Sequence, residues 1–348
     1  AGLACEEQVN ARLVLEKGDR ENKPWRVEFG PFEESRFNHL PESNWSLLVS
    51  DVEKHLPETK ALLHPFRFIP DWRVDDLMIS YAPPGGSVGA HTDAYDVFLI
   101  QLNGQRRWSI SEHFSAETLQ HTDLCILKGF TAEQEWVLDA GDMLYLPPNV
   151  AHHGIAQDMK DENGDEVHCL TASVGFRAPS LKTICSEYVH YLNDNTHNES
   201  RYRDSSPTRP EHHAEISDDT VTHFIEYLKQ GLTLDRDLVK RWLGQYCSDN
   251  KAFEDIAGDY QQVDFATLSD IASHCTLMQS PYSRFLFSYS GSAALLFVNG
   301  ASYPVSKEFA EAICEDEQFE FQQLLSIMTA DDKDILLTLF NLGAVITD

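Results

Sequence analysis

The first 178 residues contain short runs of β-branched and aromatic residues, separated by glycine, proline and asparagine. Such runs favour strands, and the residues between them favour turns. Their close spacing indicates a barrel or a sandwich rather than alternating strand–helix units. Residues 44–56 (NWSLLVSDVEKHL), which precede most of the strand-like runs, are expected to be helical. The strand-like runs are WRVEFG, DDLMISYAP, DVFLIQL, RRWSI, EWVLDAGDMLYLPP and LTASVGFRAP.

The sequence changes character after residue 178, where helical patterns replace strand patterns. Residues 181–194, 217–232 and 234–247 are predicted to be helices, because apolar side chains recur at helical spacing in the first two segments. Ser217, which stands ahead of two aspartates, is a plausible N-cap for the second of these helices.

The last part of the chain combines short helical segments with a small sheet. Residues 285–305 read as a hairpin, and the Asn299-Gly300 pair is typical of its tight turn. Helices around a small sheet suggest a winged helix. We therefore predict three parts: a mainly β domain (1–178), an α-helical domain (179–262) and a winged-helix-like α+β domain (263–348).

His91 and Asp93 lie two residues apart, just before the apolar run at 97–100. Alternate side chains of an extended segment point the same way, so these two groups share one face. Two metal-capable side chains aimed into one space suggest a metal site. A third ligand must then come from elsewhere in the chain.

The segment GDMLYLPPNVAHHGI, residues 141–155, supplies that ligand. Its pattern G-x5-P-x-N-x2-H resembles the second cupin motif, with Asn149 where a glycine is usual. Asparagine adopts the left-handed backbone conformation more readily than most residues. The spacing selects His152; His153 is the alternative, but on a strand it would face the opposite way.

Two histidines and one carboxylate leave three coordination positions open, which favours Fe(II) and O2 chemistry. A 2-oxoacid could chelate through two of these positions and leave the third for O2. A dicarboxylate would also need a cation for its far carboxylate. Arg106 and Arg107 are both candidates; only one of two adjacent strand residues points inward, and the alternative is that both are surface residues.

The segment PDWRVDDLMISYAPPGGSVGAHTDAYDVFLIQLNGQRRW, together with LPPNVAHHG and SVGFRAP, resembles the bacterial JmjC-type ribosomal oxygenases. These cupin-related enzymes use Fe(II), 2-oxoglutarate and O2, and the prokaryotic members hydroxylate an arginine of a large-subunit ribosomal protein. The resemblance implies a double-stranded β-helix (jelly roll), then a helical dimerisation domain and a winged helix. It also implies metal ligands at His91, Asp93 and His152, a 2-oxoglutarate site at Arg106, and further residues before the start of this sequence.

A strand over DDLMISYAP is expected to form one wall of the substrate pocket. Asp76 and Met78 share a face of this strand, while Leu77 and Ile79 share the face that packs in the core. A buried carboxylate needs a cation, and a substrate guanidinium suits it. We expect Tyr95 to flank the arginine stem and Ser173 to lie at the rim. The alternative is that Asp76 pairs with Arg73 and only stabilises the barrel.

The charge balance bears on the partner. The chain has 27 basic and 56 acidic residues, a net charge of −29, which should repel nucleic acid and suit a basic ribosomal protein. Its seven cysteines form no CxxC pair, which fits the reducing cytoplasm. No apolar run is long enough for a membrane helix.

Two other functions compete with arginine hydroxylation. One is a related oxygenase that acts on histidine or on a small molecule. The other is a winged-helix regulator with a sensory cupin, but the only basic residues over 307–348 are Lys307 and Lys333, a poor match for DNA. We expect no direct DNA binding.

The helical part is expected to form a homodimer through residues 180–260. The segments CSEYVHYL and VTHFIEYL carry apolar and aromatic faces that a small helical unit cannot bury alone. The alternative is that these faces pack against the neighbouring domains.

Overall fold

The computed structural model describes residues 1–16, 25–120, 122–196, 200–203, 212, 214–250 and 262–347. The chain divides into two compact units, Ala1–Ala178 and Pro179–Asp348. The first is rich in strands, whereas the second combines helices with small sheets, which confirms the predicted fold class. The finer division at residue 262 stays a prediction. Among the described residues, no helix has the length and apolar character needed to cross a membrane.

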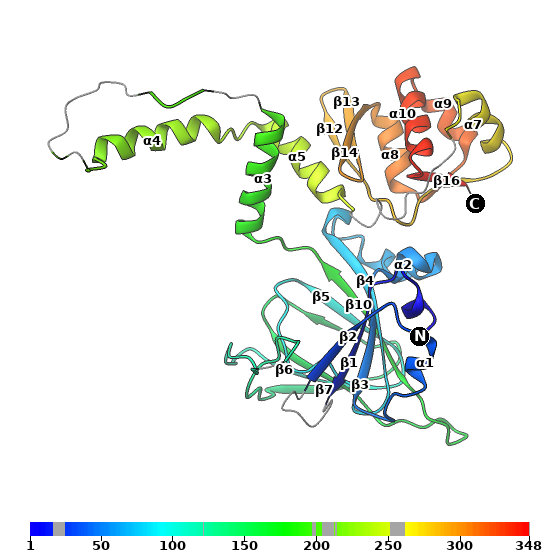
Figure 1. The fold of residues 1–348 in the computed structure, drawn as a ribbon. Coiled ribbons are helices and arrows are strands. Elements are labelled where there is room, and N and C mark those ends of the chain that lie inside the picture. Colours follow the sequence, from blue (N-terminus) through cyan, green and yellow to red (C-terminus); the bar gives the residue numbers. More distant parts are fainter. Residues whose placement is uncertain are drawn as a thin grey trace. The chain divides into compact units, whose positions relative to one another are not determined.

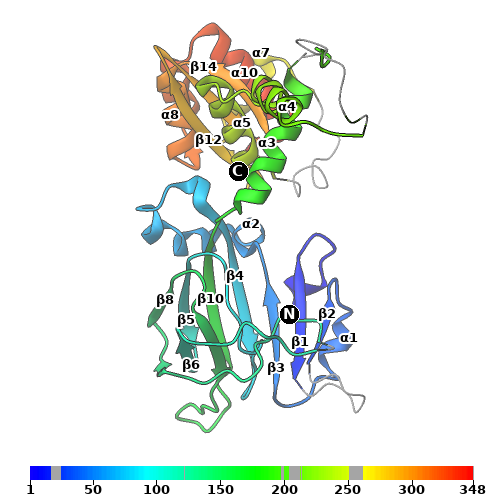
Figure 2. The same cartoon turned by 90° about the vertical axis from the view of Figure 1, so that its left-hand side faces the viewer.

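Two antiparallel sheets build the first unit. The larger has the strand order β2-β1-β3-β4-β10-β5-β8, and the smaller has the order β7-β6-β9. From β5 onward the chain passes repeatedly between the sheets, as in a double-stranded β-helix. Figure 2 shows β4 and β10 side by side, although they are far apart in sequence. The strands are β1 (Ala11–Glu16), β2 (Trp25–Phe29), β3 (Trp45–Val49), β4 (Val74–Ala82), β5 (Val97–Asn103), β6 (Arg106–Ser111), β7 (Gln134–Leu138), β8 (Met143–Leu146), β9 (Ala151–Ala156) and β10 (Cys169–Phe176).

The helix expected over residues 44–56 is wrong for most of its length. Residues Trp45–Val49 form β3, which pairs with β1 on one side and β4 on the other, and only Val52–His55 form a short helix, α2. All five residues of β3 are buried, so both faces of the strand are covered. A short apolar run of this kind has no period that separates a strand from a helix. The two neighbouring strands decide the outcome.

Two apolar clusters lie on opposite faces of the larger sheet. Between the sheets, Leu99 of β5 packs with Trp108 of β6, and Gly154 of β9 approaches the indole so closely that an added Cβ would lie 2.6 Å from the ring. On the other face, Leu77 and Phe176 pack with Phe66, which comes from short 3-10 turns. The short helices of this unit are η1 (Leu3–Cys5), α1 (Glu34–Phe37), η2 (Pro57–Leu62), η3 (His64–Phe66) and η4 (Asp71–Arg73).

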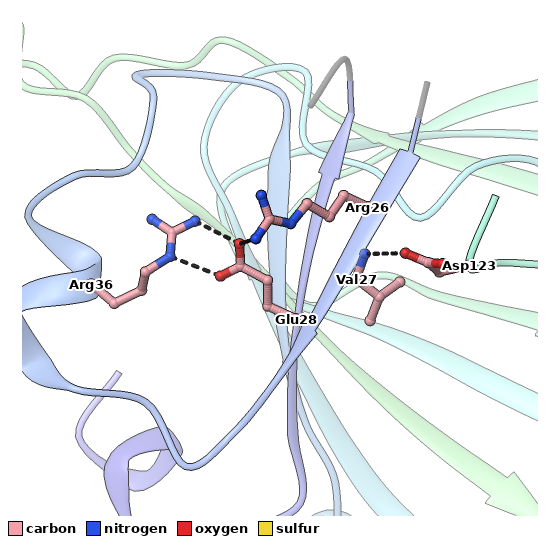
Figure 3. A network of polar contacts seen from close by, with 5 residues as sticks. All are labelled: Arg26, Val27, Glu28, Arg36 and Asp123. Carbon is pink, nitrogen blue, oxygen red and sulfur yellow. Dashed lines mark hydrogen bonds and ion pairs between the residues drawn. The ribbon is translucent and has the colours of Figure 1, made fainter. Parts of the chain in front are cut away.

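The edge strand β2 is held by polar contacts (Figure 3). The Arg36 guanidinium of α1 donates to both carboxylate oxygens of Glu28, at 2.8 and 3.2 Å, and Arg26 lies 3.1 Å from the same carboxylate. The Val27 N–H donates to Asp123, which belongs to the long connection after β6. An exposed strand edge invites pairing with other chains, and these contacts occupy part of this one.

The second unit begins with long helices and ends in a compact core around small sheets (Figure 1). Ser217 caps α4 as predicted, because its side chain accepts from the Thr220 N–H. The Asn299-Gly300 turn is also confirmed: both residues have positive φ, and Val298 pairs with Ala301. The elements are α3 (Leu181–Asn195), α4 (Asp218–Gly231), α5 (Arg236–Ser248), α7 (Phe265–Ala272), β11 (Leu277–Gln279), β12 (Phe285–Ser290), β13 (Ala293–Val298), β14 (Ala301–Val305), α8 (Lys307–Glu315), β15 (Gln318–Phe319), α9 (Phe321–Ile327), α10 (Ala330–Asn341) and β16 (Val345–Thr347).

Helix α5 packs against the β12–β14 sheet. Its Gly244 leaves no room for a side chain, because a Cβ there would lie 2.3 Å from the Phe297 ring. The opposite side of the helix packs Trp242 against Tyr188 of α3. Helix α5 therefore joins the helical region to the small sheet, whereas α4 exposes Phe224, Ile225 and Leu228.

Candidate metal centre

The two segments that carry the predicted ligands are paired through their backbones. The His91 N–H donates to the His152 carbonyl at 3.0 Å, and the His152 N–H donates to the His91 carbonyl at 2.9 Å. The Asn149 N–H also donates to the Asp93 carbonyl, at 2.7 Å. Asn149 has φ 63, the left-handed conformation expected for it. This pairing places two histidines opposite each other in the space between the sheets.

His91, Asp93 and His152 form a group of potential metal ligands whose donor atoms all lie within 4.8 Å of one another. The Asp93 Oδ2 atom is 3.5 Å from Nε2 of His152 and 3.9 Å from Nε2 of His91. Nδ1 of His91 lies 2.9 Å from the Gly89 carbonyl oxygen, and Nδ1 of His152 lies 3.0 Å from the Val150 carbonyl oxygen. If each Nδ1 donates there, Nε2 is left with a free lone pair for a cation.

Burial favours neutral imidazole at this centre. Desolvation, followed by the neighbouring His91, lowers the pKa of His152 to about 4. A metal needs the neutral form of the ring, so little free energy is spent on removing a proton. His153, the alternative ligand, faces the other way, with its ring 6.2 Å from that of Phe130. Burial also lowers the pKa of His153 to about 4.

Tyr95 orients the carboxylate of this group. Its hydroxyl makes a side-chain hydrogen bond with Asp93, and desolvation, followed by the Asp93 charge, raises the pKa of Tyr95 to about 12. The phenol therefore stays protonated and donates to the carboxylate. The interpretation of Tyr95 as a flank of the substrate stem stays a prediction, and the side chain does line the same cavity.

The three potential ligands line a cavity of about 330 Å³ that also contains Arg106. Arg106 is 3% exposed, and its Nε donates to Sγ of Cys169 at 3.4 Å. Among the described residues, its buried Nη2 has no hydrogen-bond partner. Arg107 faces outward and lies 3.3 Å from the Glu135 carboxylate. An orphaned guanidinium nitrogen at the cavity wall fits an anionic guest, because a carboxylate would satisfy it.

Strand β4 forms another wall of the cavity with the predicted facing. Asp76 and Met78 line the cavity, whereas Leu77 packs in the cluster on the other face of the sheet. Ser173 of β10 pairs with Met78 across the sheet and lines the cavity as well. All the residues predicted for the metal, cofactor and substrate therefore surround one space.

Hydrogen bonds hold Asp76, and no cation pairs with it in the part of the chain that the structure describes. Its carboxylate accepts from the Ser50 hydroxyl and from the Asp51 N–H. Burial, followed by the charges of Asp51 and Asp75, raises the pKa of Asp76 to about 6. The alternative pairing with Arg73 is wrong, because the Arg73 guanidinium donates to Asp96 at 3.3 Å and to the Arg177 carbonyl at 2.6 Å.

Sequence reasoning missed the cavity residues that come from the first strands. Arg12 of β1 and Ser46 of β3 line the cavity, as does Asp51 in the turn after β3. The strand-like runs that the sequence predicts do not include ARLVLE, and the sequence predicts a helix where β3 forms. The apolar character of both runs was the available signal, but only sheet pairing places Arg12 and Ser46 on the inner face.

Comparison with protein families gives two matches. Residues 61–184 match the JmjC domain, and residues 226–345 match a ROXA-like winged helix. The second match includes α5, in agreement with the packing of this helix on the small sheet.

The chain is similar to proteins from Escherichia coli. It is 37% identical to the ribosomal protein uL16 3-hydroxylase of strain K12 over 258 residues, which are 74% of this chain and 65% of that protein. The X-ray structure of E. coli YcfD has 30% identity and a TM-score of 0.83, covering 100% of this chain and 89% of that one. A structure of the ribosomal oxygenase YcfD in complex with cobalt and 2-oxoglutarate has 29% identity and a TM-score of 0.78, covering 100% and 89% of the two chains.

The geometry predicts different effects for the two adjacent histidines. His152→Ala should lower the affinity for Co(II) by more than about 100-fold, since it removes a ligand outright and loss of a supporting group alone costs about 10–100-fold. His153→Ala should leave the affinity within about twofold, because its ring points away from the group. Calorimetric titration of the metal-free protein with Co(II) measures both. Weak binding by His153→Ala together with normal binding by His152→Ala would contradict the assignment.

Proposed function

Because the chain belongs to the JmjC-domain ribosomal oxygenase family, we propose that it is a 2-oxoglutarate-dependent hydroxylase of an arginine in a large-subunit ribosomal protein. The observation that carries the proposal is one cavity that joins three groups: a His-Asp-His set, a buried guanidinium with an orphaned donor, and the half-buried carboxylate of Asp76. Each group suits one participant of the reaction.

His91, Asp93 and His152 would hold Fe(II). Their donor set is the two-histidine, one-carboxylate type that leaves three positions for other ligands. When bound, the metal supplies the activation of O2 that couples oxidative decarboxylation of 2-oxoglutarate to hydroxylation of a C–H bond. The chain itself orients the ligands: carbonyls accept from Nδ1 of each histidine, and Tyr95 donates to Asp93.

Arg106 would bind the far carboxylate of 2-oxoglutarate. Its Nε is already committed to Cys169, and its buried Nη2 is the donor that lacks a partner among the described residues. The Nε1 atom of the neighbouring Trp108 is likewise buried and lacks a partner there. These donors provide a site for a carboxylate that is screened from water. The structure of YcfD with cobalt and 2-oxoglutarate supports this choice of cosubstrate.

The acidic wall of the cavity, which consists of Asp51, Asp75 and Asp76, would hold the substrate arginine. Among the described residues, no cation pairs with Asp76, so a substrate guanidinium would supply the positive partner for its carboxylate. Met78 and Ser173 lie beside it, and Asp51 and Asp75 add negative charge. The net charge of −29 also favours a basic ribosomal protein. The uL16 hydroxylase of E. coli suggests uL16 as the protein to test first.

Ribosomal proteins provide the direct test. In a strain that lacks this gene, one large-subunit protein should lose the mass of one oxygen atom, and tandem mass spectrometry should place the missing oxygen on an arginine. Restoring the gene should restore the oxygen, whereas a gene encoding Asp93→Ala should not. If the missing oxygen lies on a histidine, the target is histidine and not arginine. Unchanged ribosomal proteins would refute the proposal.

We further propose that the protein acts in the cytoplasm as a homodimer. The described part of α4 exposes Val221, Phe224, Ile225 and Leu228, with exposures between 43% and 58%. Exposed apolar side chains along one helix are costly in water and favour burial against another copy. Cytoplasmic action follows from a ribosomal substrate.

Alanine substitutions at the adjacent Arg106 and Arg107 form a matched pair of tests for cosubstrate binding. Arg106→Ala should weaken 2-oxoglutarate binding well over tenfold, because losing one partner of a buried charge pair costs about 2–5 kcal/mol. Arg107→Ala removes an exposed pair and should change it less than about threefold. Calorimetry with Co(II)-loaded protein measures the affinities, and Co(II) binding itself should be nearly unchanged. The opposite order of effects would contradict the role of Arg106.

Asp76 should give peptide recognition a pH dependence. A guanidinium needs the ionised carboxylate, so affinity for a uL16 arginine peptide should fall as the pH drops through about 6. Asp76→Asn should weaken the peptide more than about tenfold at pH 7.5 and flatten this pH profile. Its affinity for 2-oxoglutarate should be unchanged.

The same substitution should not destabilise the fold at neutral pH. A carboxyl whose pKa is raised by folding contributes stability that is present below about pH 3.8 and lost as the pH rises through about 6. Asparagine avoids this loss, so the midpoint of thermal unfolding at pH 7.5 should be equal or higher. A variant that unfolds, or one that hydroxylates the peptide normally, would refute the arginine pocket.

The dimer is tested by light scattering at micromolar protein. The wild-type chain should give twice the monomer mass of 39.5 kDa. Phe224→Asp with Leu228→Asp should give the monomer mass, because charges in an apolar contact are costly. The paired control is Glu226→Lys, on the same helix and also exposed. A monomeric wild-type protein would refute the dimer.

A further inference from the structure

The backbone pairing of β4 with β3 ends halfway along β4. Strand β3 pairs with β4 at Leu47–Tyr81, Leu48–Ser80 and Val49–Ile79, and no further pair of these strands is formed. The chain leaves the sheet at Ser50, and Asp51 adopts a left-handed conformation with φ 57. Strand β4 nevertheless continues to Val74. The stretch that carries Asp76 therefore has no β3 backbone beside it.

A buried side chain takes the place of that backbone. The Glu53 carboxylate of α2 accepts from the Leu77 N–H at 3.1 Å. Glu53 is 7% exposed, and no ion pair joins it to a cation within the described part of the chain. The neighbouring Lys54 pairs instead with Asp51 at 2.5 Å. A buried N–H without an acceptor is costly, so this contact determines how β4 runs at Leu77.

The position of this contact links it to the cavity. Leu77 stands between Asp76 and Met78, which both line the cavity, while Leu77 itself is fully buried on the other face. The same corner also touches Asp76 directly, through the Ser50 hydroxyl and the Asp51 N–H. Residues of one turn thus hold two successive residues of β4.

We propose that Glu53 is a positioning residue for the substrate pocket: its carboxylate replaces the missing β3 backbone at Leu77 and so fixes Asp76 and Met78 in the cavity wall. This inference rests on the proposed function, because Asp76 is there the partner of the substrate guanidinium. Glu53 does not line the cavity and touches no reacting group.

The buried carboxyl group of Glu53 agrees with a positioning role. Burial raises the pKa of Glu53 to about 7, against the opposing effect of hydrogen bonds from its own N–H and from Leu77. Such a group costs stability compared with an apolar side chain of similar size. What the position requires is an acceptor oxygen, and glutamine also supplies one.

Three variants test the role. Glu53→Leu removes the acceptor but keeps the bulk, Glu53→Gln keeps an acceptor without the charge, and Glu58→Ala removes an exposed glutamate nearby. Glu53→Leu should raise KM for the uL16 arginine peptide by about fivefold to a hundredfold, because small misplacements of a binding group are costly. Its affinities for 2-oxoglutarate and Co(II) should change less than about twofold. Glu53→Gln should restore KM, and Glu58→Ala should match the wild type.

Two further measurements separate positioning from general stability. The Leu77 amide should exchange with deuterium more than about tenfold faster in Glu53→Leu, with slow exchange restored in Glu53→Gln. In the Asp76→Asn background, Glu53→Leu should cause little further loss of peptide binding, because it acts through Asp76. Glu53→Ala serves as a second variant should leucine not fit.

The outcomes distinguish this inference from the proposed function. If the wild-type protein neither binds nor hydroxylates any arginine peptide, the proposed function fails. If the wild type binds the peptide and Glu53→Leu binds it equally well, the positioning role alone is overturned. It is also overturned if neither Glu53→Leu nor Glu53→Ala folds, or if both lose Co(II) and 2-oxoglutarate as strongly as they lose peptide.

Discussion

The reciprocal backbone pairing of His91 and His152 is the interaction on which the rest of the site depends. It joins a segment before β5 to the first half of β9, and it turns both imidazoles into the space between the two sheets. Nearness in sequence cannot hold these residues within reach of each other, because His91 precedes β5 whereas His152 lies on β9. The backbone bonds do so at little entropic cost, since both segments are already ordered by their neighbouring strands.

Around that pairing, the cavity separates charge along its walls. The buried Arg106 guanidinium lies on β6. Asp75 and Asp76 lie on β4, and Asp51 follows β3 and lines the same cavity. In the proposed reaction, the positively charged wall would attract the anionic cosubstrate and the negatively charged wall would attract the cationic substrate. Among the described residues, no ion pair joins Arg106 to Asp76. The three potential metal ligands line the same cavity, where the proposed cosubstrate and substrate would meet.

The acidic wall also shows how a β-barrel makes room for a ligand. Pairing between β3 and β4 stops at Val49, and the turn after it contributes Asp51 to the cavity. Opening a sheet in this way leaves an unpaired N–H at Leu77, and the Glu53 carboxylate accepts it. The cavity is therefore formed where regular pairing ends and side chains replace it. A completely paired sheet would have left no space for the Ser50–Asp51 turn beside Asp76.

The sequence by itself determined the β-rich first unit, the helical pattern of the second, the spacing of His91, Asp93 and His152, and the alternation that separates Asp76 from Leu77. These features depend on local periodicity and on short motifs, which a strand or helix expresses wherever it lies. Only the tertiary structure decided that residues 45–49 are a strand, that Arg12 and Ser46 line the cavity, and that Arg73 pairs with Asp96 rather than with Asp76. Each of these outcomes depends on which segments become neighbours. A run that is buried on both faces carries no period, and a charged side chain pairs with whichever partner the fold brings within reach.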